Sequence, residues 1–329
     1  MTTLSVTTRS LRGPDGAASA AVLEASARRV LDFGIHSIVL DEDFTLPEWD
    51  ILTRFFPAES VSAAFAFAPL PRPTPLGKEP PPSLVSQDAD EISAARQRLT
   101  RQIEFLGSNG VSRVVLPPAQ ISAPSRTEVR RALGTAEMAD LPRVIEQLRR
   151  RRETSAAVPQ ELDSLLRVLD ALLQAADRHG VEVSLQPASL PSEMPASGEI
   201  STLLAEFGGA PLSVSVNTLG VERSLYCQVE GASTLLETFD ERLSSVFVED
   251  GHLLAGKLPV GGGSVGFERW RPIFAGARSR DWVLDLAEGA TDDTLQAGIA
   301  LLEGLSAPPS ASVDSNPSPF LDKSLRDLV

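Results

Sequence analysis

The sequence predicts an α/β protein built as one closed (β/α)₈ barrel, and three observations lead to that prediction. Eight short runs rich in β-branched residues are spaced along the chain, amphipathic helical patterns separate them, and several patterns end at a glycine before the next run. Strands that alternate with helices indicate a parallel sheet, and eight such units close a barrel. We expect the barrel over residues 1–305 and a disordered tail over residues 306–329.

The strands are expected in short segments where apolar residues dominate or alternate with small polar ones. In chain order they are residues 4–8, 37–41, 61–67, 113–116, 182–186, 212–217, 245–249 and 282–286. The clearest helical patterns lie between them, over residues 20–33, 91–107, 160–178 and 292–305. Gly34, Gly110 and Gly180 are expected to supply the left-handed backbone that ends three helices.

Three segments depart from the repeating unit. Residues 69–82, PLPRPTPLGKEPPP, predict a proline-rich loop after the third strand, which either crosses the barrel mouth or serves as a peptide ligand for another domain. Residues 122–159 predict an extra helical arm, whose basic run 149–152 is expected to be a solvated helix end. The residues after Leu305 are rich in serine and proline, which is typical of disorder.

Composition and charge exclude several classes of protein. The chain has 329 residues, 42% of them apolar, and a formal charge of −14, which disfavours nucleic acid as a partner because phosphate binding needs a basic surface. The single cysteine, Cys227, excludes an intrachain disulfide and fits a reducing compartment. No signal-peptide pattern and no apolar run of membrane-spanning length is found. We therefore expect a cytoplasmic protein without membrane or nucleic-acid partners.

The stretches HGVEVSLQP, SGEISTLLAEFGGAPLSVSVNT and LPVGGGSVGFERW resemble corresponding segments of the xylose isomerase-like TIM barrels. That family includes sugar-phosphate isomerases and epimerases and the endonuclease IV branch. The resemblance covers about residues 1–305. It implies a barrel of the same kind, whose relatives hold a divalent cation at the C-terminal mouth with carboxylates and histidines from different strands. The negative charge argues against the DNA-repair branch.

The positions that match the family's metal ligands mostly hold other residues here. They are, in chain order, Gln186, Asn217, Gly220, Phe247 and Lys257, while Asp285 at the eighth strand is the one retained carboxylate. Amides keep the shape of the acids but carry no charge, and a hard cation or Zn²⁺ needs several anionic oxygens or neutral imidazoles. The resemblance therefore implies a divergent member that has lost its metal site, with no metal and no cofactor.

Candidate site residues stand where strands end. Lys257 and Asp285 are the candidate catalytic residues, because a lysine ammonium could occupy part of the lost cation's space, pair with Asp285 and stabilise an anionic oxygen. Lysine is rare, with only Lys78, Lys257 and Lys323 in the chain. The candidate ligand-binding residues are Gln186, Asn217, Glu249 and His252. The acids after the second and seventh strands, Asp41, Glu42, Asp43 and Asp250, are either solvated or part of a rebuilt site.

The run Gly261-Gly262-Gly263 precedes the seventh helix. Its backbone amides could hold a phosphate, since barrel phosphate sites often use loops near strands seven and eight. Glycine runs also serve tight turns, so both interpretations stay open.

Three functions fit these observations. The first is a non-catalytic barrel that binds a small polar molecule or a protein partner. The second is a metal-independent isomerase, epimerase or lyase that acts on a carbohydrate-like substrate with Lys257 and Asp285. The third is a structural subunit paired with an active paralogue. A mouth lined by polar strand-end residues would favour the first two, and a mouth plugged by Phe247, Leu219 and the proline-rich loop would favour the third.

Overall fold

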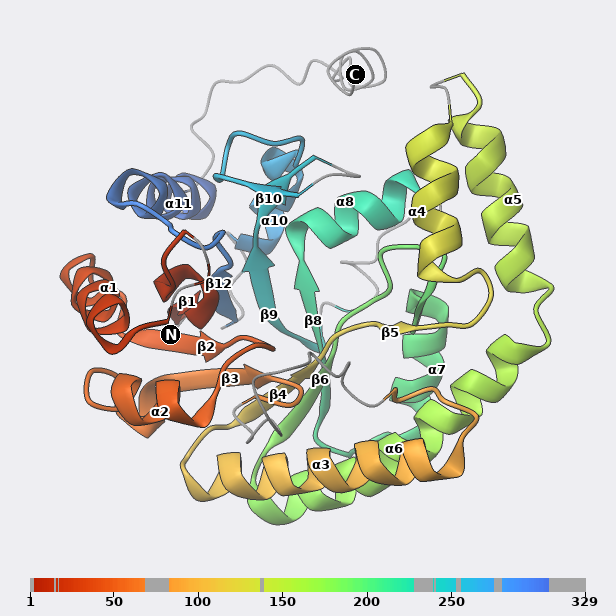
Figure 1. Cartoon of the computed structure of the whole chain (residues 1–329), viewed down its shortest axis with the longest axis horizontal. Coiled ribbons are helices and arrows are strands. Elements are labelled where there is room, and N and C mark those ends of the chain that lie inside the picture. The colour runs from red at the N-terminus through yellow and green to blue at the C-terminus, as the bar shows by residue number, and fades with distance from the viewer. Residues whose placement is uncertain are drawn as a thin grey trace.

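Eight parallel strands close into a barrel in a computed structural model that describes residues 3–14, 16, 18–68, 83–136, 139–227, 239, 241–252, 256–274 and 280–307 (Figure 1). The ring runs β1-β12-β9-β8-β6-β4-β3-β2, so every strand lies beside its neighbour in the repeat. Leu4 stands opposite Trp282 where the first and last strands close the ring. The strands are β1 (Leu4–Thr7), β2 (Ser37–Leu40), β3 (Val61–Phe65), β4 (Arg113–Leu116), β6 (Glu182–Leu185), β8 (Leu212–Asn217), β9 (Leu243–Val248) and β12 (Asp281–Leu284). All eight predicted strands are confirmed.

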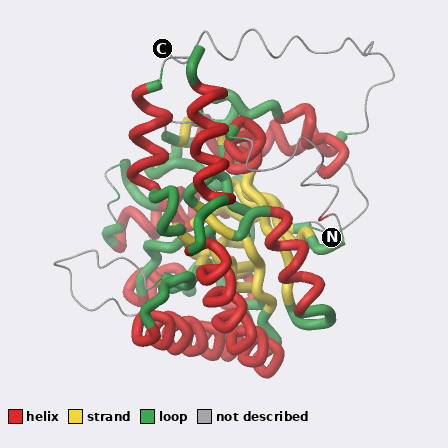
Figure 2. Tube along the Cα trace, turned by 90° about the vertical axis from the view of Figure 1, so that its right-hand side faces the viewer, coloured by secondary structure: helices red, strands yellow, loops and turns green. Residues whose placement is uncertain are grey.

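Helices surround the barrel, as Figure 2 shows from the side. They are α1 (Ala20–Asp32), α2 (Leu46–Leu52), α3 (Ala89–Ser108), α6 (Ala157–His179), α7 (Ser197–Glu206), α8 (Thr218–Tyr226), α10 (Arg271–Phe274) and α11 (Asp292–Ser306), with short 3₁₀ turns η1 (Thr8–Leu11), η2 (Ala58–Ser60) and η3 (Phe267–Trp270). The predicted glycine stops are confirmed, because Gly34, Gly110 and Gly180 have φ of 77°, 80° and 65°. Two small antiparallel pairs lie outside the barrel, β5 (Ala119–Gln120) with β7 (Glu193–Met194) and β10 (Asp250–Gly251) with β11 (Lys257–Leu258).

The barrel interior is polar in its part toward the N-terminal ends of the strands. The Ser215 hydroxyl lies 2.6 Å from the hydroxyls of both Ser184 and Ser245, one on each neighbouring strand. Nearer the N-terminal ends of the strands, Arg113 donates to Glu182 at 2.7 Å and to Asp281 at 2.6 Å. The buried serine hydroxyls satisfy one another, and the partly exposed Arg113 guanidinium pairs with two carboxylates.

An apolar belt lies between the serines and the mouth of the barrel. Phe247 stands two residues after Ser245 on β9 and two before Glu249, so all three face the interior. Its ring packs on Phe65 with centroids 5.2 Å apart. The belt consists of Val39, Ala63, Phe65, Val115, Phe247 and Val283. Phe247, which matches a histidine position of the resembled family, therefore fills the core.

The predicted helical arm is present as α4 (Arg126–Thr135) and α5 (Leu141–Glu153), which share a small core with the buried Cys227. Burial raises the pKa of the Cys227 thiol to about 12. The expectation that residues 149–152 form a solvated run is wrong at its last member, because Arg152 is buried and donates to Glu199 at 2.7 Å. A buried guanidinium needs a carboxylate partner, and α7 supplies it.

The barrel ends with α11 at Ser306, one residue from the predicted limit. The predicted proline-rich loop over residues 69–82 and the predicted tail beyond Ala307 lie outside the described residues. Within the residues that the structure describes, no helix is long and apolar enough to cross a membrane.

Candidate functional site

The candidate site is the mouth formed by the C-terminal ends of the parallel strands. These ends meet at one face of a barrel, which is where such folds place their functional groups. Directly at or after five strands stand Asp41, Gln186, Asn217, Glu249 and Asp285. All except Asn217 are buried. The structure therefore gathers at one end of the molecule the strand-end residues that the sequence singled out.

Lys257 reaches this mouth on a hairpin. Strand β10 follows β9 after one residue and pairs with β11, so that Lys257 stands opposite Gly251. Its ammonium lies 2.7 Å from Glu249 Oε2 and 2.5 Å from Asp285 Oδ2. The lysine side chain is 24% exposed and the two carboxylates only 6% and 10%. The contact with Asp285 that the sequence suggested is present, and Glu249 is a second partner.

The two carboxylates that share this ammonium have pKa values shifted in opposite directions. Burial raises the pKa of Glu249 and is only partly offset by Lys257. Burial also acts to raise the pKa of Asp285, but the positive charges of Lys257 and Arg9 outweigh burial, so the pKa of Asp285 is lowered. A 3.0 Å hydrogen bond from the Thr7 hydroxyl adds to this lowering. Glu249 is therefore the carboxyl that holds a proton more readily.

The charge of Lys257 is stabilised by these neighbours. Burial alone would lower the pKa of the ammonium, but Asp285 and Glu249 outweigh burial and raise it above the ordinary value. The nearby positive charge of Arg9 opposes that rise without reversing it. The ammonium is thus a fixed cation at the mouth at neutral pH.

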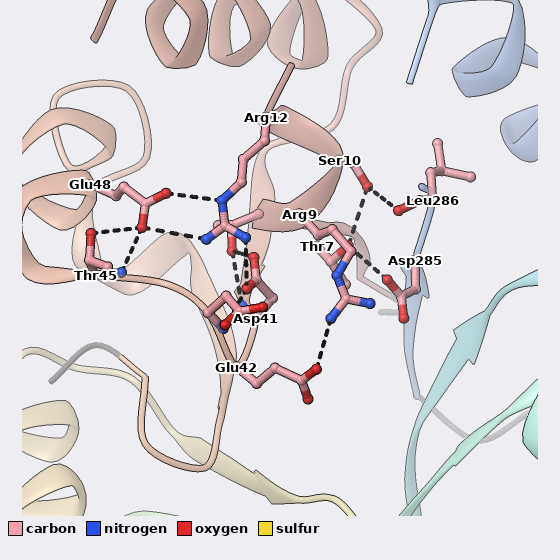
Figure 3. A network of polar contacts seen from close by, with 12 residues as sticks. Thr7, Arg9, Ser10, Arg12, Asp41, Glu42, Thr45, Glu48, Asp285 and Leu286 are labelled. Atoms are coloured by element: carbon pink, nitrogen blue, oxygen red, sulfur yellow. Dashed lines mark hydrogen bonds and ion pairs between the residues drawn. The ribbon is translucent and has the colours of Figure 1, made fainter. Parts of the chain in front are cut away.

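Two arginines complete the charged side of the mouth, as Figure 3 shows. Arg9 lies 3.2 Å from Glu42, and Asp285 also helps to raise its pKa against burial. Arg12 is buried between Asp41, at 3.2 Å, and Glu48, at 3.0 Å.

Sequence reasoning missed both arginines, although they lie two and five residues after the end of the first strand. That position was the available signal, because residues after a barrel strand lie at the mouth.

Asp250 fixes the hairpin to the glycine-rich loop. Its buried carboxylate accepts backbone N–H bonds from Gly251 at 2.8 Å, from Gly261 and Gly263 at 2.9 Å each, and from Val265 at 3.2 Å. The amides of Gly261 and Gly263 are thus used within the protein and are not available to hold a phosphate. A β-carbon at Gly263 would collide with the backbone of Gly251. The glycine run serves a tight turn.

Asn217 and Gly220 have a structural role. The Asn217 side-chain oxygen accepts from the Gly220 amide and caps the N-terminus of α8. A β-carbon at Gly220 would collide with that side chain. This explains why β8 ends in an amide followed three residues later by a glycine. His252 lies partly exposed at the end of β10.

The donors at the mouth do not fit a divalent cation. Within the described part of the chain, no group of three or more His, Cys, Asp or Glu side chains could hold a metal ion. The carboxylates of Glu249 and Asp285 are neutralised by Lys257, and the oxygen of Asn217 is used as a helix cap. A cation would have to displace the ammonium to reach both carboxylates.

Comparison with known proteins finds likeness in structure only. No protein-family model and no curated protein sequence matches the chain. A D-tagatose 3-epimerase-like protein is 11% identical, with 92% of this chain and 97% of that chain covered and a TM-score of 0.60. D-allulose 3-epimerase from Methylomonas sp., in complex with D-allulose, is 14% identical, with 90% of each chain covered and a TM-score of 0.57. A xylose isomerase domain protein from Planctomyces limnophilus is 12% identical, with 92% and 95% covered and a TM-score of 0.53.

These similarities confirm the expected fold. The chain has the architecture of xylose isomerase-like TIM barrels over nearly its whole described length. Identities this low establish the fold alone, and activity has to be argued from the site.

Proposed function

We propose that the barrel mouth binds a small, polar, carbohydrate-like molecule without a divalent metal ion, as a non-catalytic binding protein. The observation that carries this proposal is the Lys257 ammonium held between Glu249 and Asp285 at the strand ends. An ammonium has three N–H donors. The two carboxylates take two of them, and the third can donate to a carbonyl or hydroxyl oxygen of a ligand.

The class of ligand is supported by the fold. Solved structures with this architecture include a D-allulose 3-epimerase in complex with D-allulose and a D-tagatose 3-epimerase-like protein. Polar strand-end groups at the same end of the barrel, with a fixed cation among them, are suited to a hydroxyl-rich molecule. Binding of a protein partner, an active paralogue among the candidates, stays a prediction.

A second candidate function is metal-independent isomerisation, epimerisation or lyase chemistry at the same mouth. It is favoured by one observation, namely that Glu249 and Asp285 share Lys257 yet have pKa values pushed apart. Such a pair assigns one carboxyl to hold a proton and the other to stay ionised. Lys257 would then stabilise the oxygen of an enolate while Glu249 moves the proton.

The test is sugar binding with metal removed. D-allulose and D-fructose are titrated by calorimetry into the EDTA-treated protein, into Lys257→Met and into Arg150→Met, which removes an exposed cation on α5. We expect binding to survive EDTA, to be unchanged in Arg150→Met and to weaken at least about ten-fold in Lys257→Met, the loss of one charge-assisted bond. Binding that requires added Mn²⁺ or Mg²⁺, or that ignores Lys257, would overturn the proposal.

Turnover separates the two candidates. The bound sugar is incubated with the protein in D₂O and followed by proton NMR. Deuterium uptake at the carbon beside the carbonyl, lost in Glu249→Gln, would establish the second function. Binding without exchange over days would leave the non-catalytic function.

A further inference from the structure

A small pocket opens beside the charged cluster, between the loop after β6 and helix α8. Its lining consists of Gln186, Pro187, Ala188, Val216, Asn217, Gly220, Val221 and Ser224. Among the described residues of the lining there is no lysine, arginine or carboxylate, in contrast to the side of the mouth that holds Lys257. It has room for about one water-sized group. The mouth therefore has a charged side and a neutral side.

One buried polar group in the lining of this pocket lacks a partner, and a second polar side chain shares the lining. Ser224 is 1% exposed, and its hydroxyl makes no hydrogen bond to any described residue. Gln186 is 5% exposed and its backbone N–H donates to the Leu116 carbonyl at 2.9 Å, which leaves its side-chain amide to line the pocket. Asn217 adds an amide whose oxygen is already used by the Gly220 amide. Buried polar groups are rarely left unpaired in folded proteins, so the lining is incomplete without an occupant.

The chemistry of the lining limits what the occupant can be. A hydroxyl group both donates and accepts, so it can satisfy the Gln186 amide and the Ser224 hydroxyl together. A methyl group would leave the buried Ser224 hydroxyl unpaired. A phosphate or carboxylate would bring a charge into a site whose described lining holds no cation, besides being too large for it.

We propose that this pocket is a subsite for one uncharged hydroxyl group of the ligand, held by Gln186 and Ser224. The inference rests on the proposed function and deepens it, because it makes the neutral side of the mouth a specificity determinant. A ligand would place a hydroxyl here and its carbonyl or other polar end toward Lys257.

The test removes one hydroxyl at a time from the sugar and one polar side chain at a time from the protein, and compares the binding affinities. The probe is the tighter-binding sugar of D-allulose and D-fructose, with its 1-deoxy, 3-deoxy, 4-deoxy and 6-deoxy analogues. Each is titrated into the wild type, Ser224→Ala and Gln186→Met. We expect one deoxy analogue to bind the wild type about ten-fold or more weakly than the parent sugar, because loss of that hydroxyl leaves the buried Ser224 hydroxyl unpaired. That difference in affinity between the parent sugar and the deoxy analogue should vanish in both variants. The differences measured for the other analogues should persist.

Stability offers a readout that needs no ligand. Ser224→Ala removes a hydroxyl that has no partner, so its melting temperature should equal or exceed that of the wild type. Ser215→Ala is the matched control, because that buried hydroxyl bonds to Ser184 and Ser245, and its melting temperature should fall. A fall for Ser224→Ala as large as for Ser215→Ala would contradict an unpaired hydroxyl.

The outcomes separate the subsite from the proposed function. One outcome is that the parent sugar binds and Lys257→Met weakens its binding, but no affinity difference between parent and deoxy sugar depends on Gln186 and Ser224. The pocket then holds water only, so the subsite is wrong while the proposed function stands. If neither sugar binds the wild type, the proposed function is wrong and the subsite falls with it.

Discussion

Replacing Asp250 by asparagine tests whether this carboxylate holds the Lys257 hairpin in place. Each carboxylate oxygen accepts two backbone N–H bonds, Oδ1 from Gly251 and Val265 and Oδ2 from Gly261 and Gly263. The NH₂ group of an asparagine cannot accept, so two bonds are lost whichever way the amide turns. Hydrogen bonds to a charged group contribute about 1.5–3 kcal/mol each. The free energy of unfolding should therefore fall by roughly 3–6 kcal/mol.

Urea denaturation at pH 7 measures that loss. The control is Ser264→Ala, which removes one neutral hydrogen bond from the same loop, from Ser264 Oγ to the Gly251 carbonyl at 3.0 Å. It should cost only about 0.5–1.5 kcal/mol. Asp250→Asn should also weaken sugar binding, because Lys257 lies on the same hairpin. A loss below about 1 kcal/mol in Asp250→Asn would refute the four-bond clamp.

Two further substitutions test the site. Lys257→Met removes the nearest cation from two buried carboxylates, which raises the folded-state pKa of both and most strongly affects Glu249, since Arg9 still acts on Asp285. The variant should be roughly 3 kcal/mol less stable at pH 7, and the deficit should narrow as the pH falls toward about 4, since the folded state then binds protons more tightly than the unfolded state. Unfolding free energies that differ equally at every pH would contradict this. Gly220→Ala should cost at least about 1 kcal/mol by displacing the Asn217 cap, and calorimetric melting that matches the wild type would contradict the cap.

The strands and helices could be predicted because their signals are local. β-branched runs, helical periodicity and the glycines at Gly34, Gly110 and Gly180 depend on neighbours along the chain. The rule that functional groups follow barrel strands also located Glu249 and Asp285 correctly at the mouth.

The residues that line the inside of the barrel could not be predicted. Alternation of apolar and polar residues along a strand does not say which set faces the barrel interior. In LSVSVN the valines look like the core face and the serines like the solvent face. In the structure both faces are buried, with Ser213 and Ser215 inside the ring and Val214 packed toward the helices. A barrel strand has no solvent face. Its alternating pattern therefore shows that the two sides differ, but it does not say which side faces the barrel interior and which faces the helices.

The remaining features depend on contacts between distant segments. The Asp250 clamp joins residues up to 15 positions apart, and the Arg113 ion pairs join residues 69 and 168 positions apart. Arg152 looked solvated because its three preceding arginines are, while its partner Glu199 lies on another helix. The partners of Arg113 and Arg152 lie too far along the chain for one sequence window to contain both members of the pair.

The apolar belt around Phe65 and Phe247 makes the barrel a blind-ended cup. Nothing can pass from the mouth to the serine-lined base, because the belt fills the ring with close-packed side chains. Molecules that arrive and molecules that depart must use one opening. If the mouth turns over a sugar, its product therefore competes with the next substrate for the same passage, and it will act as a competitive inhibitor.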